Sequence, residues 1–281
     1  MKKKKVLTIL NRFNVGGPIY NVIFLTNYLN KNNFETLLIG GKCESYEQSS
    51  KYILDKENIK FTEIKHMKRA ISPFHDFISL IEIILVLYKF KPYIIHTHAA
   101  KAGLLGRIAC IFYFNKKKII HTYHGNVFEG YFSNFKNKII LIVERLLSKK
   151  TDKIIALSNL QKNDLVNKYF ICTEDKIEVV PLGLDLKKFL HNLVKKRQKK
   201  RAEFEISNDQ VLISIIGRLV PIKNHKFFID VINFCRKKTN FKLKALVIGD
   251  GSEINNLINY AKSLGLKYNY KKMITKDYDI F

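Results

Sequence analysis

The sequence has few cysteines, no long uninterrupted apolar run and a shortage of acidic residues. Its four cysteines lie far apart and form no C-x-x-C pair, which excludes a zinc ribbon or a redox motif and suits a reducing compartment. The apolar run after the N-terminal lysines is too short for a signal peptide. The longest apolar stretch, residues 77–90, contains Glu82 and falls short of the ~18 residues that a membrane span needs. We therefore expect a cytoplasmic protein, soluble or peripheral on the inner face of the cell membrane.

Basic residues outnumber acidic residues by 50 to 24, which gives a formal net charge of +26. Such a surface attracts polyanions, meaning nucleic acid or the anionic surface of a membrane. Of the 50 cationic residues 42 are lysine and only 8 are arginine, whereas nucleic-acid binding favours arginine for its bidentate contacts. A general compositional bias toward lysine is the alternative explanation of the excess. We expect an anionic membrane surface as a partner and no nucleic acid.

The 281 residues, 47% of them hydrophobic, suffice for two domains with buried cores. Short β-branched runs alternate with amphipathic stretches, the pattern of a parallel sheet covered by helices. In the first half, strands are predicted at 6–10, 36–39, 59–64, 93–97, 118–123, 153–157 and 176–180, and helices at 18–30, 73–90, 103–114 and 136–148.

The pattern starts again after a Pro- and Gly-containing linker at 181–185. Strands are predicted at 211–216 and 243–248, helices at 224–236 and 253–264, and a basic helix at 195–201. Two strand–helix units cannot cover both faces of a sheet as the first half can. We predict an α/β protein with two Rossmann-like domains, residues 1–182 and an incomplete domain at 183–281.

Paired glycines follow two of the predicted strands, each where a helix begins. Gly16 and Gly17 allow a ligand to approach the backbone closely, and the N-terminus of the following helix favours an anion. Gly249 and Gly251 lie in the same kind of turn after a later strand. The first pair does not fit G-x-G-x-x-G, which argues against a dinucleotide. An ordinary tight turn is the alternative for each pair.

Two cations, Arg218 and Lys223, lie between the first strand and the next helix of the second half. The guanidinium group donates hydrogen bonds in a bidentate geometry and the ammonium group is a compact point charge, so both can bind one doubly charged group. A diphosphate leaving group needs such neutralisation as its bond to a sugar breaks. The segment therefore predicts a diphosphate site; two exposed cations at a strand end are the alternative.

Four histidines follow two neighbouring strands: His96 and His98 on one, His121 and His124 on the next. Parallel strands would bring them together at the carboxyl edge of the sheet, where α/β proteins bind ligands. No cysteine or aspartate accompanies them and Glu129 is the only nearby carboxylate, so we expect no metal site. We predict that His124 contacts a sugar or a phosphate; packing or turn-capping is the alternative for His96 and His121.

Taken in order, these motifs resemble glycosyltransferase family 4, retaining enzymes of the GT-B architecture. The likeness runs from residue 6 to about residue 266. Besides the motifs described above, it rests on four further segments within this range, residues 95–103, 122–125, 152–158 and 180–185. Residues 121–133 are similar to members that build bacterial surface polysaccharides, such as lipopolysaccharide or capsule.

The resemblance implies transfer of a hexosyl or N-acetylhexosaminyl group from a nucleotide-diphosphate sugar to a lipid-linked saccharide, with retention and without metal or other cofactor. His124 would face the transferred sugar, while Arg218 and Lys223 would hold the diphosphate. The glycines Gly16, Gly17, Gly249 and Gly251 would contact the donor. The acceptor-side candidates are His98, Lys101, Asn126 and Glu129.

The sequence departs from the family after Gly265, because the Glu-x7-Glu segment that grips the donor sugar and ribose has no match there. We therefore expect a truncated second domain and weak or absent transfer. A non-catalytic remnant that binds an acceptor or a partner is the alternative function.

Overall fold

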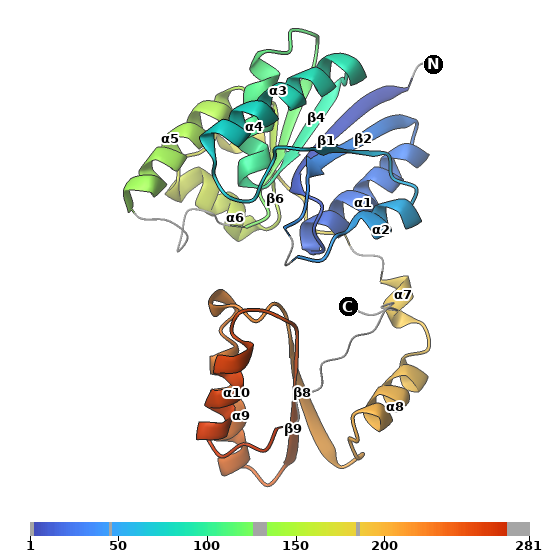
Figure 1. The fold of residues 1–281 in the computed structure, drawn as a ribbon, viewed down its shortest axis with the longest axis vertical. Coiled ribbons are helices and arrows are strands. Elements are labelled where there is room, and N and C mark those ends of the chain that lie inside the picture. Colours follow the sequence, from blue (N-terminus) through green and yellow to red (C-terminus); the bar gives the residue numbers. More distant parts are fainter. Residues whose placement is uncertain (1–2, 45–46, 126–133, 184–185, 269–281) are drawn as a thin grey trace. The chain divides into compact units, whose positions relative to one another are not determined.

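The computed structural model describes residues 3–44, 47–125, 134–183 and 186–268. The chain divides into two compact units, residues 1–185 and 186–281 (Figure 1). The division lies three residues beyond the boundary at 182 that the sequence suggests, within the segment that it identifies as a linker.

Seven parallel strands form the sheet of the first unit, in the order β3-β2-β1-β4-β5-β6-β7. They are β1 (Lys4–Arg12), β2 (Phe34–Gly41), β3 (Phe61–Ile64), β4 (Ile94–His98), β5 (Lys118–Thr122), β6 (Lys153–Ala156) and β7 (Ile177–Val179). The strand order reverses between β1 and β4, which is where open parallel sheets leave a crevice for ligands at their carboxyl edge. All seven strands predicted for this half are confirmed.

Helices cover both faces of this sheet (Figure 1). On one face lie α1 (Gly17–Lys31) and α2 (Lys51–Lys56), and on the other α3 (Pro73–Phe90), α4 (Ala100–Ile111) and α5 (Asn134–Lys149). Because successive strand residues point to opposite faces, neighbouring Leu38 and Ile39 belong to the two separate cores. The short elements that follow are α6 (Asn159–Asn163), the π-helical η1 (Asp164–Lys168) and the 3₁₀-helical η2 (Glu174–Lys176). The sequence prediction missed α2 and α6.

Helix α3 has the predicted bounds, and local chemistry explains both ends. Pro73 occupies the first turn, where its missing N–H group costs no hydrogen bond. Lys91 ends the helix in the left-handed conformation, with φ of 54°. The following Pro92 cannot continue a helix.

Helix α4 packs unusually close to the sheet because two of its turns carry glycine. A Cβ atom added to Gly103 would lie 2.4 Å from the His121 ring, and one added to Gly106 would lie 2.7 Å from the Thr97 methyl group. Even an alanine at either position would therefore push the helix away from β4 and β5.

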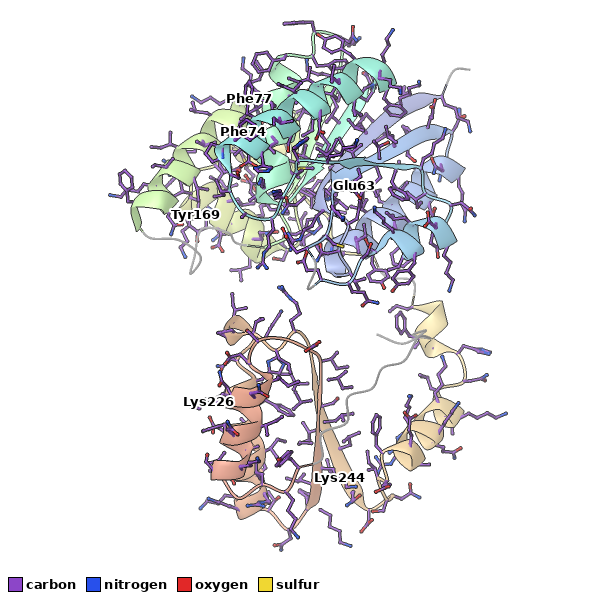
Figure 2. The ribbon with its side chains drawn as sticks, in the orientation of Figure 1. Glu63, Phe74, Phe77, Tyr169, Lys226 and Lys244 are labelled. Atoms are coloured by element: carbon purple, nitrogen blue, oxygen red, sulfur yellow. The ribbon has the colours of Figure 1, made fainter. Side chains whose placement is uncertain are left out.

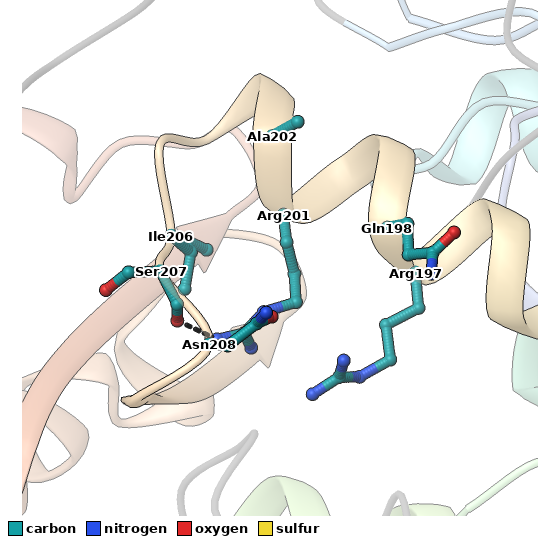
Figure 3. Close-up of a pocket in the computed structure, with 7 residues that line it drawn as sticks. All are labelled: Arg197, Gln198, Arg201, Ala202, Ile206, Ser207 and Asn208. Carbon is teal, nitrogen blue, oxygen red and sulfur yellow. Dashed lines mark hydrogen bonds between the residues drawn. The ribbon is translucent and has the colours of Figure 1, made fainter.

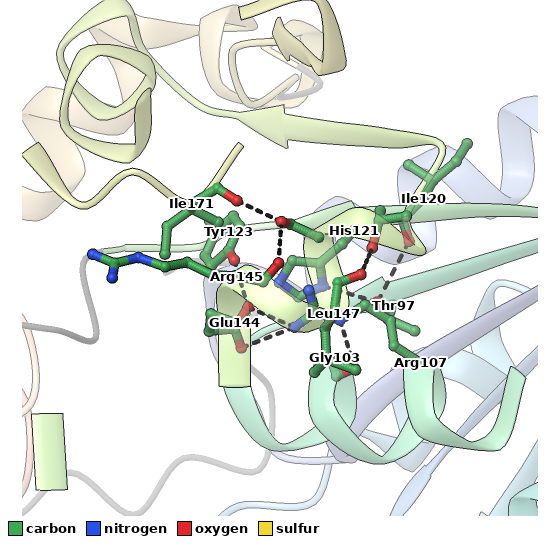
Figure 4. Close-up of polar contacts among 12 residues, drawn as sticks. Thr97, Gly103, Arg107, Ile120, His121, Tyr123, Glu144, Arg145, Leu147 and Ile171 are labelled. Atoms are coloured by element: carbon green, nitrogen blue, oxygen red, sulfur yellow. Dashed lines mark hydrogen bonds and ion pairs between the residues drawn. The ribbon is translucent and has the colours of Figure 1, made fainter. Parts of the chain in front are cut away.

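A buried polar network joins α4, α5 and the end of β5 (Figure 4). One guanidinium nitrogen of Arg107 contacts both carboxylate oxygens of Glu144, at 2.7 and 2.8 Å. The Tyr123 hydroxyl donates to the same carboxylate at 2.5 Å. Burial, with the Glu144 charge, raises the pKa of Tyr123 well above its usual range, so the hydroxyl remains a donor.

The second unit contains the parallel strands β8 (Gln210–Ile216) and β9 (Lys242–Ile248), which pair along their whole length. Its helices are α7 (Lys187–Leu190), α8 (Leu193–Glu203), α9 (His225–Lys238) and α10 (Ile254–Ser263), with the 3₁₀ turn η3 (Pro221–Lys223) before α9. Both strands and the helices α8, α9 and α10 match the sequence prediction, and α8 has no buried residue.

We predict that Glu144→Ala lowers the free energy of unfolding by about 3–5 kcal/mol, because it leaves the Arg107 charge buried without its partner. Urea unfolding followed by circular dichroism measures the change. The control is Glu178→Ala, which removes the exposed pair of Glu178 with Lys153 at 3.0 Å and should cost at most about 1 kcal/mol. Equal effects of the two substitutions would contradict this role for the network.

Candidate functional site

The loop between β1 and α1 presents open backbone at the carboxyl edge of the sheet. Gly17 is exposed at the first position of α1, and a Cβ atom added there would meet no atom within 4 Å. Gly16 precedes it as the N-cap, and Pro18 follows in the first turn. The orphan N–H groups of this helix N-terminus therefore face accessible space, as the predicted anion site requires.

Two residues that the sequence analysis did not single out hold this loop in place. The Arg12 guanidinium contacts both carboxylate oxygens of Glu47, at 2.5 and 2.6 Å. The Val15 N–H group donates to the Gln48 carbonyl at 2.9 Å, so the loop is tied to residues 47–48 through backbone and side chain. The Arg12 hydrogen bond holds the pKa of Glu47 below its usual range. No sequence motif signals this pair, because 35 residues separate its members.

Three of the four predicted histidines come together at the carboxyl end of β4 and just after β5. The rings of His96 and His98 lie on the same side of β4, with centroids 4.1 Å apart, as their alternate positions predict. His98 Nδ1 lies 2.9 Å from His124 Nε2, and these two rings stack at a centroid distance of 5.1 Å. His96 Nε2 lies 2.8 Å from the Thr122 hydroxyl.

Burial keeps these three rings neutral. It lowers the pKa of His96 to about 3, and that of His98 well below its ordinary value. The pKa of His124 is also lowered by burial. Between two neutral rings one nitrogen donates and the other accepts, so the contact orients the His124 ring and couples its tautomer to that of His98.

The fourth histidine lies on the opposite face, so the expectation that all four would gather is wrong for His121. His121 is the register partner of Thr97, which lies between His96 and His98 on β4, and its side chain therefore points to the opposite face, toward α4. His121 Nδ1 lies 2.8 Å from the Thr97 hydroxyl, and its ring packs edge-on against Tyr123 at 4.5 Å (Figure 4). Its role is packing, the alternative that the sequence left open.

A cavity of about 270 Å³ opens beside His124. Its other lining residues are Gly125, Leu157, Ser158, Leu160, Gln161 and Asp164. Ser158 caps α6 by accepting from the Gln161 N–H group at 3.1 Å, and the Gln161 side chain accepts from the Leu157 N–H group at 2.7 Å. This is close to a Ser-x-x-Gln capping box directly after a strand. Such a pattern predicts the start of a helix, so it could have located α6 and this wall of the cavity from the sequence.

Two of the four acceptor-side candidates have structural roles. His98 is fully buried and holds His124. The Lys101 ammonium group lies 2.5 Å from Asp76 and donates to the carbonyls of Lys68 and Ala70. It therefore fastens α4 to the start of α3 and to the loop before it. Asn126 and Glu129 lie outside the described residues.

In the second unit, Arg218 and Lys223 flank the loop that leads from β8 into α9. Both side chains are exposed, and within the described parts of the chain no hydrogen bond or ion pair engages either head group. The backbone between them is ordered by hydrogen bonds from Val220 N–H to the Arg218 carbonyl and from Lys223 N–H to the Val220 carbonyl, at 2.9 and 3.0 Å. Two exposed cations on a fixed loop are compatible with the predicted site for a doubly charged anion, which stays a prediction.

The glycines after β9 serve this loop by letting two backbone segments touch. A Cβ atom added to Gly249 would lie 1.9 Å from the Gly217 carbonyl oxygen, and one added to Gly251 would lie 2.3 Å from the Leu219 carbonyl oxygen. Leu219 N–H also donates to the Asp250 carbonyl at 2.9 Å. These contacts explain both glycines without a ligand, and their predicted contact with a donor stays a prediction.

A second hollow, of about 230 Å³, lies between α8 and the loop that leads to β8 (Figure 3). Arg197 and Arg201 line it, but the Arg201 guanidinium donates to the carbonyls of Ser207 and Gln210 and so ties α8 to the strand. None of the predicted donor-binding residues borders this hollow. Among the residues that the structure describes, no three His, Cys, Asp or Glu side chains are grouped to hold a metal ion.

The neutral histidines predict a loss of stability in acid. Because His96 binds a proton at pH about 3 when folded but near 6.5 when unfolded, the unfolded state holds more protons between these values. The free energy of unfolding should therefore fall as the pH falls below 6.5, by about 1.4 kcal/mol per pH unit for this histidine. Urea unfolding between pH 7 and pH 4.5 measures the slope. His96→Gln should reduce it, whereas the exposed His191→Gln should not; an unchanged slope for His96→Gln would refute the assignment.

Sequence comparisons identify relatives of both units. The profile of Glycosyltransferase Family 4 matches residues 15–188, and that of Glycosyl transferases group 1 matches residues 196–274. The chain is 32% identical over 205 residues to the UDP-Gal:alpha-D-GlcNAc-diphosphoundecaprenol alpha-1,3-galactosyltransferase of Escherichia coli, covering 71% of this chain and 51% of that protein. It is 30% identical to the capsular polysaccharide biosynthesis glycosyltransferase CapM of Staphylococcus aureus, covering 76% and 56%. The chain thus spans about half the length of these relatives.

Solved structures show the same fold. A glycosyltransferase of Rickettsia africae superposes with a TM-score of 0.71 at 22% identity, covering 95% of this chain and 66% of that one. HepE of Anabaena, in complex with UDP and glucose, superposes with a TM-score of 0.70 at 15% identity, covering 93% and 67%. The predicted α/β fold of the GT-B type is confirmed. Because the family profile matches well over half of its residues, this chain belongs to Glycosyltransferase Family 4.

Proposed function

We propose that the protein transfers a hexosyl or N-acetylhexosaminyl group from a nucleotide-diphosphate sugar to a lipid-linked or saccharide acceptor in bacterial surface polysaccharide synthesis. The observation that carries this proposal is the pair of exposed cations, Arg218 and Lys223, on the fixed loop after β8. They supply the positive charge that a departing diphosphate requires.

The comparisons support this choice of substrates. The Escherichia coli relative is named for a UDP-linked galactose and for an acceptor sugar on diphosphoundecaprenol, and the Anabaena structure holds UDP and glucose. We infer the same chemical classes for this chain: a nucleoside diphosphate as the leaving group and a saccharide on a lipid diphosphate as the acceptor.

Each group has one task in the reaction that we propose. Arg218 and Lys223 bind the diphosphate and neutralise the charge that develops as the bond from the sugar C1 to the diphosphate oxygen breaks. Gly16 and Gly17 admit the donor phosphates to the N-terminus of α1. His124, held by His98, faces the sugar and offers a neutral ring nitrogen for a hydrogen bond to it. The acceptor hydroxyl oxygen bonds to C1 with retention of configuration, its proton passes to the departing diphosphate oxygen, and no metal takes part.

The acceptor would lie in a membrane, so we place the protein at the cytoplasmic face, attached as a peripheral protein to an anionic surface. The excess of 50 basic over 24 acidic residues favours this attachment.

We predict that Arg218→Ala or Lys223→Ala lowers kcat for sugar transfer by about 10²–10³-fold, the loss typical when one fixed stabilising group is removed from a transition state. Transfer from radiolabelled nucleotide-sugars to a diphosphate-lipid-linked saccharide measures it, and product NMR gives the anomeric configuration. The matched control is Lys237→Ala, an exposed cation on α9 that should leave kcat unchanged. Binding of the lipid-linked saccharide with no turnover for any nucleotide-sugar would contradict the proposal and favour a non-catalytic binding protein.

We also predict that His124→Ala lowers kcat by at least about tenfold, because it removes a hydrogen bond to the transferred sugar. Initial rates at saturating acceptor give kcat and the donor KM separately. Leu160→Ala, which alters the same cavity but removes no polar group, serves as the control and should affect kcat far less. Similar losses in both variants would indicate that His124 acts only by shaping the cavity.

A further inference from the structure

Helix α3 is apolar on both of its faces. Ile83 and Leu87 point into the core, while the outer face exposes Phe77 and Leu85 to 62% and 65%. Figure 2 labels Phe77 and the neighbouring Phe74, which is 71% exposed, on this helix. A helix with one face in water normally carries polar residues there, so this exposed stripe at i, i+3 and i+11 spacing needs a separate explanation.

The apolar surface continues over the adjoining helices. α3 packs against α4, and α4 against α5. The Tyr88 hydroxyl of α3 donates to the Phe112 carbonyl just after α4, at 2.8 Å. We define the outer helical face by its exposed large apolar residues, which are Phe74, Phe77, Ile81, Leu85 and Tyr88 of α3, Ile111, Phe112 and Phe114 at the end of α4, and Phe135, Ile139, Ile142 and Leu146 of α5.

The charges of these three helices have one sign where they are accessible. Their only carboxylates are Asp76, Glu82 and Glu144. Each has a partner on the protein: Lys101 at 2.5 Å, His66 at 3.0 Å and Arg107 at 2.7 Å, respectively. Among the side chains of these helices that the structure describes, the exposed charged residues are lysines: Lys89 of α3, and Lys138 and Lys149 of α5.

We propose that the outer helical face docks onto an anionic lipid bilayer, with its aromatic and aliphatic side chains in the headgroup boundary and its lysines on the lipid phosphates. An apolar surface with cationic edges has the composition of a membrane-surface element. A symmetric contact with a second copy would instead bring the lysines of both copies together. None of the described helices is long and apolar enough to span a bilayer.

This inference deepens the proposed function by naming the surface that meets the membrane, and it can be tested without turnover. The full-length protein is sedimented with sucrose-loaded vesicles of phosphatidylglycerol and phosphatidylethanolamine, and with vesicles of phosphatidylcholine alone. The variant Phe77→Glu/Leu85→Glu changes two exposed side chains of the face. The control Tyr28→Glu changes an exposed residue of α1, on the other side of the sheet. Circular dichroism verifies that both variants fold.

We expect the unsubstituted protein to bind the anionic vesicles more tightly than the phosphatidylcholine vesicles. Phe77→Glu/Leu85→Glu should weaken this binding by at least about tenfold, because two apolar side chains no longer leave water. Tyr28→Glu should leave it unchanged. A second variant, Lys89→Glu/Lys138→Glu, should remove the preference for anionic lipid while the protein stays folded.

Three results would overturn the inference: no binding of the unsubstituted protein to anionic vesicles, equal loss with Tyr28→Glu, or a dimer in sedimentation equilibrium that Phe77→Glu/Leu85→Glu dissociates while vesicle binding stays unchanged. A failure of the proposed function looks different. It would leave vesicle binding intact and abolish transfer to a detergent-soluble acceptor.

Discussion

The close packing of α4 against β4 and β5 is the constraint on which the first unit depends. It requires glycine at 103 and 106, because any larger residue would meet the His121 ring or the Thr97 methyl group. Arg107, one residue further, reaches the Glu144 carboxylate of α5 and so fixes the second helix as well. The same packing holds the carboxyl ends of β4 and β5, from which His98 and His124 extend toward each other.

The second unit achieves rigidity by a different route. Its two loops touch backbone to backbone at Gly249 and Gly251, and this contact fixes the segment that carries Arg218 and Lys223. Gly249 and Gly251 are therefore required for the packing of these two loops, whereas the exposed side chains of Arg218 and Lys223 remain available to a ligand. Catalysis by fixed charge depends on such preorganisation, because a loop that must reorganise during the reaction loses much of the stabilisation it could provide.

The periodicity of the sequence was sufficient to predict every described strand and each of the long helices α1, α3, α4, α5, α8, α9 and α10, since β-branched runs and apolar periodicity reflect burial directly. It failed for α2, α6 and α7, which have six, five and four residues and too few turns to show a period. Alternation along β4 correctly placed His96 and His98 together, but the same rule applied to β5 would have turned His121 away from them. The pairing of Arg12 with Glu47 and the anchoring of Lys101 could not be predicted, because they join segments far apart in the chain.

The central claim is that a nucleoside diphosphate binds at the loop after β8 through Arg218 and Lys223. The most direct test is a titration of the isotopically labelled protein with UDP, followed by the NMR signals of the Arg218 Nε and Lys223 Nζ groups. The account predicts saturable shifts of these signals with UDP, and none with uridine, which lacks the diphosphate. Unshifted signals at these two residues, or shifts confined to Arg197 and Arg201 beside the hollow at α8, would contradict it.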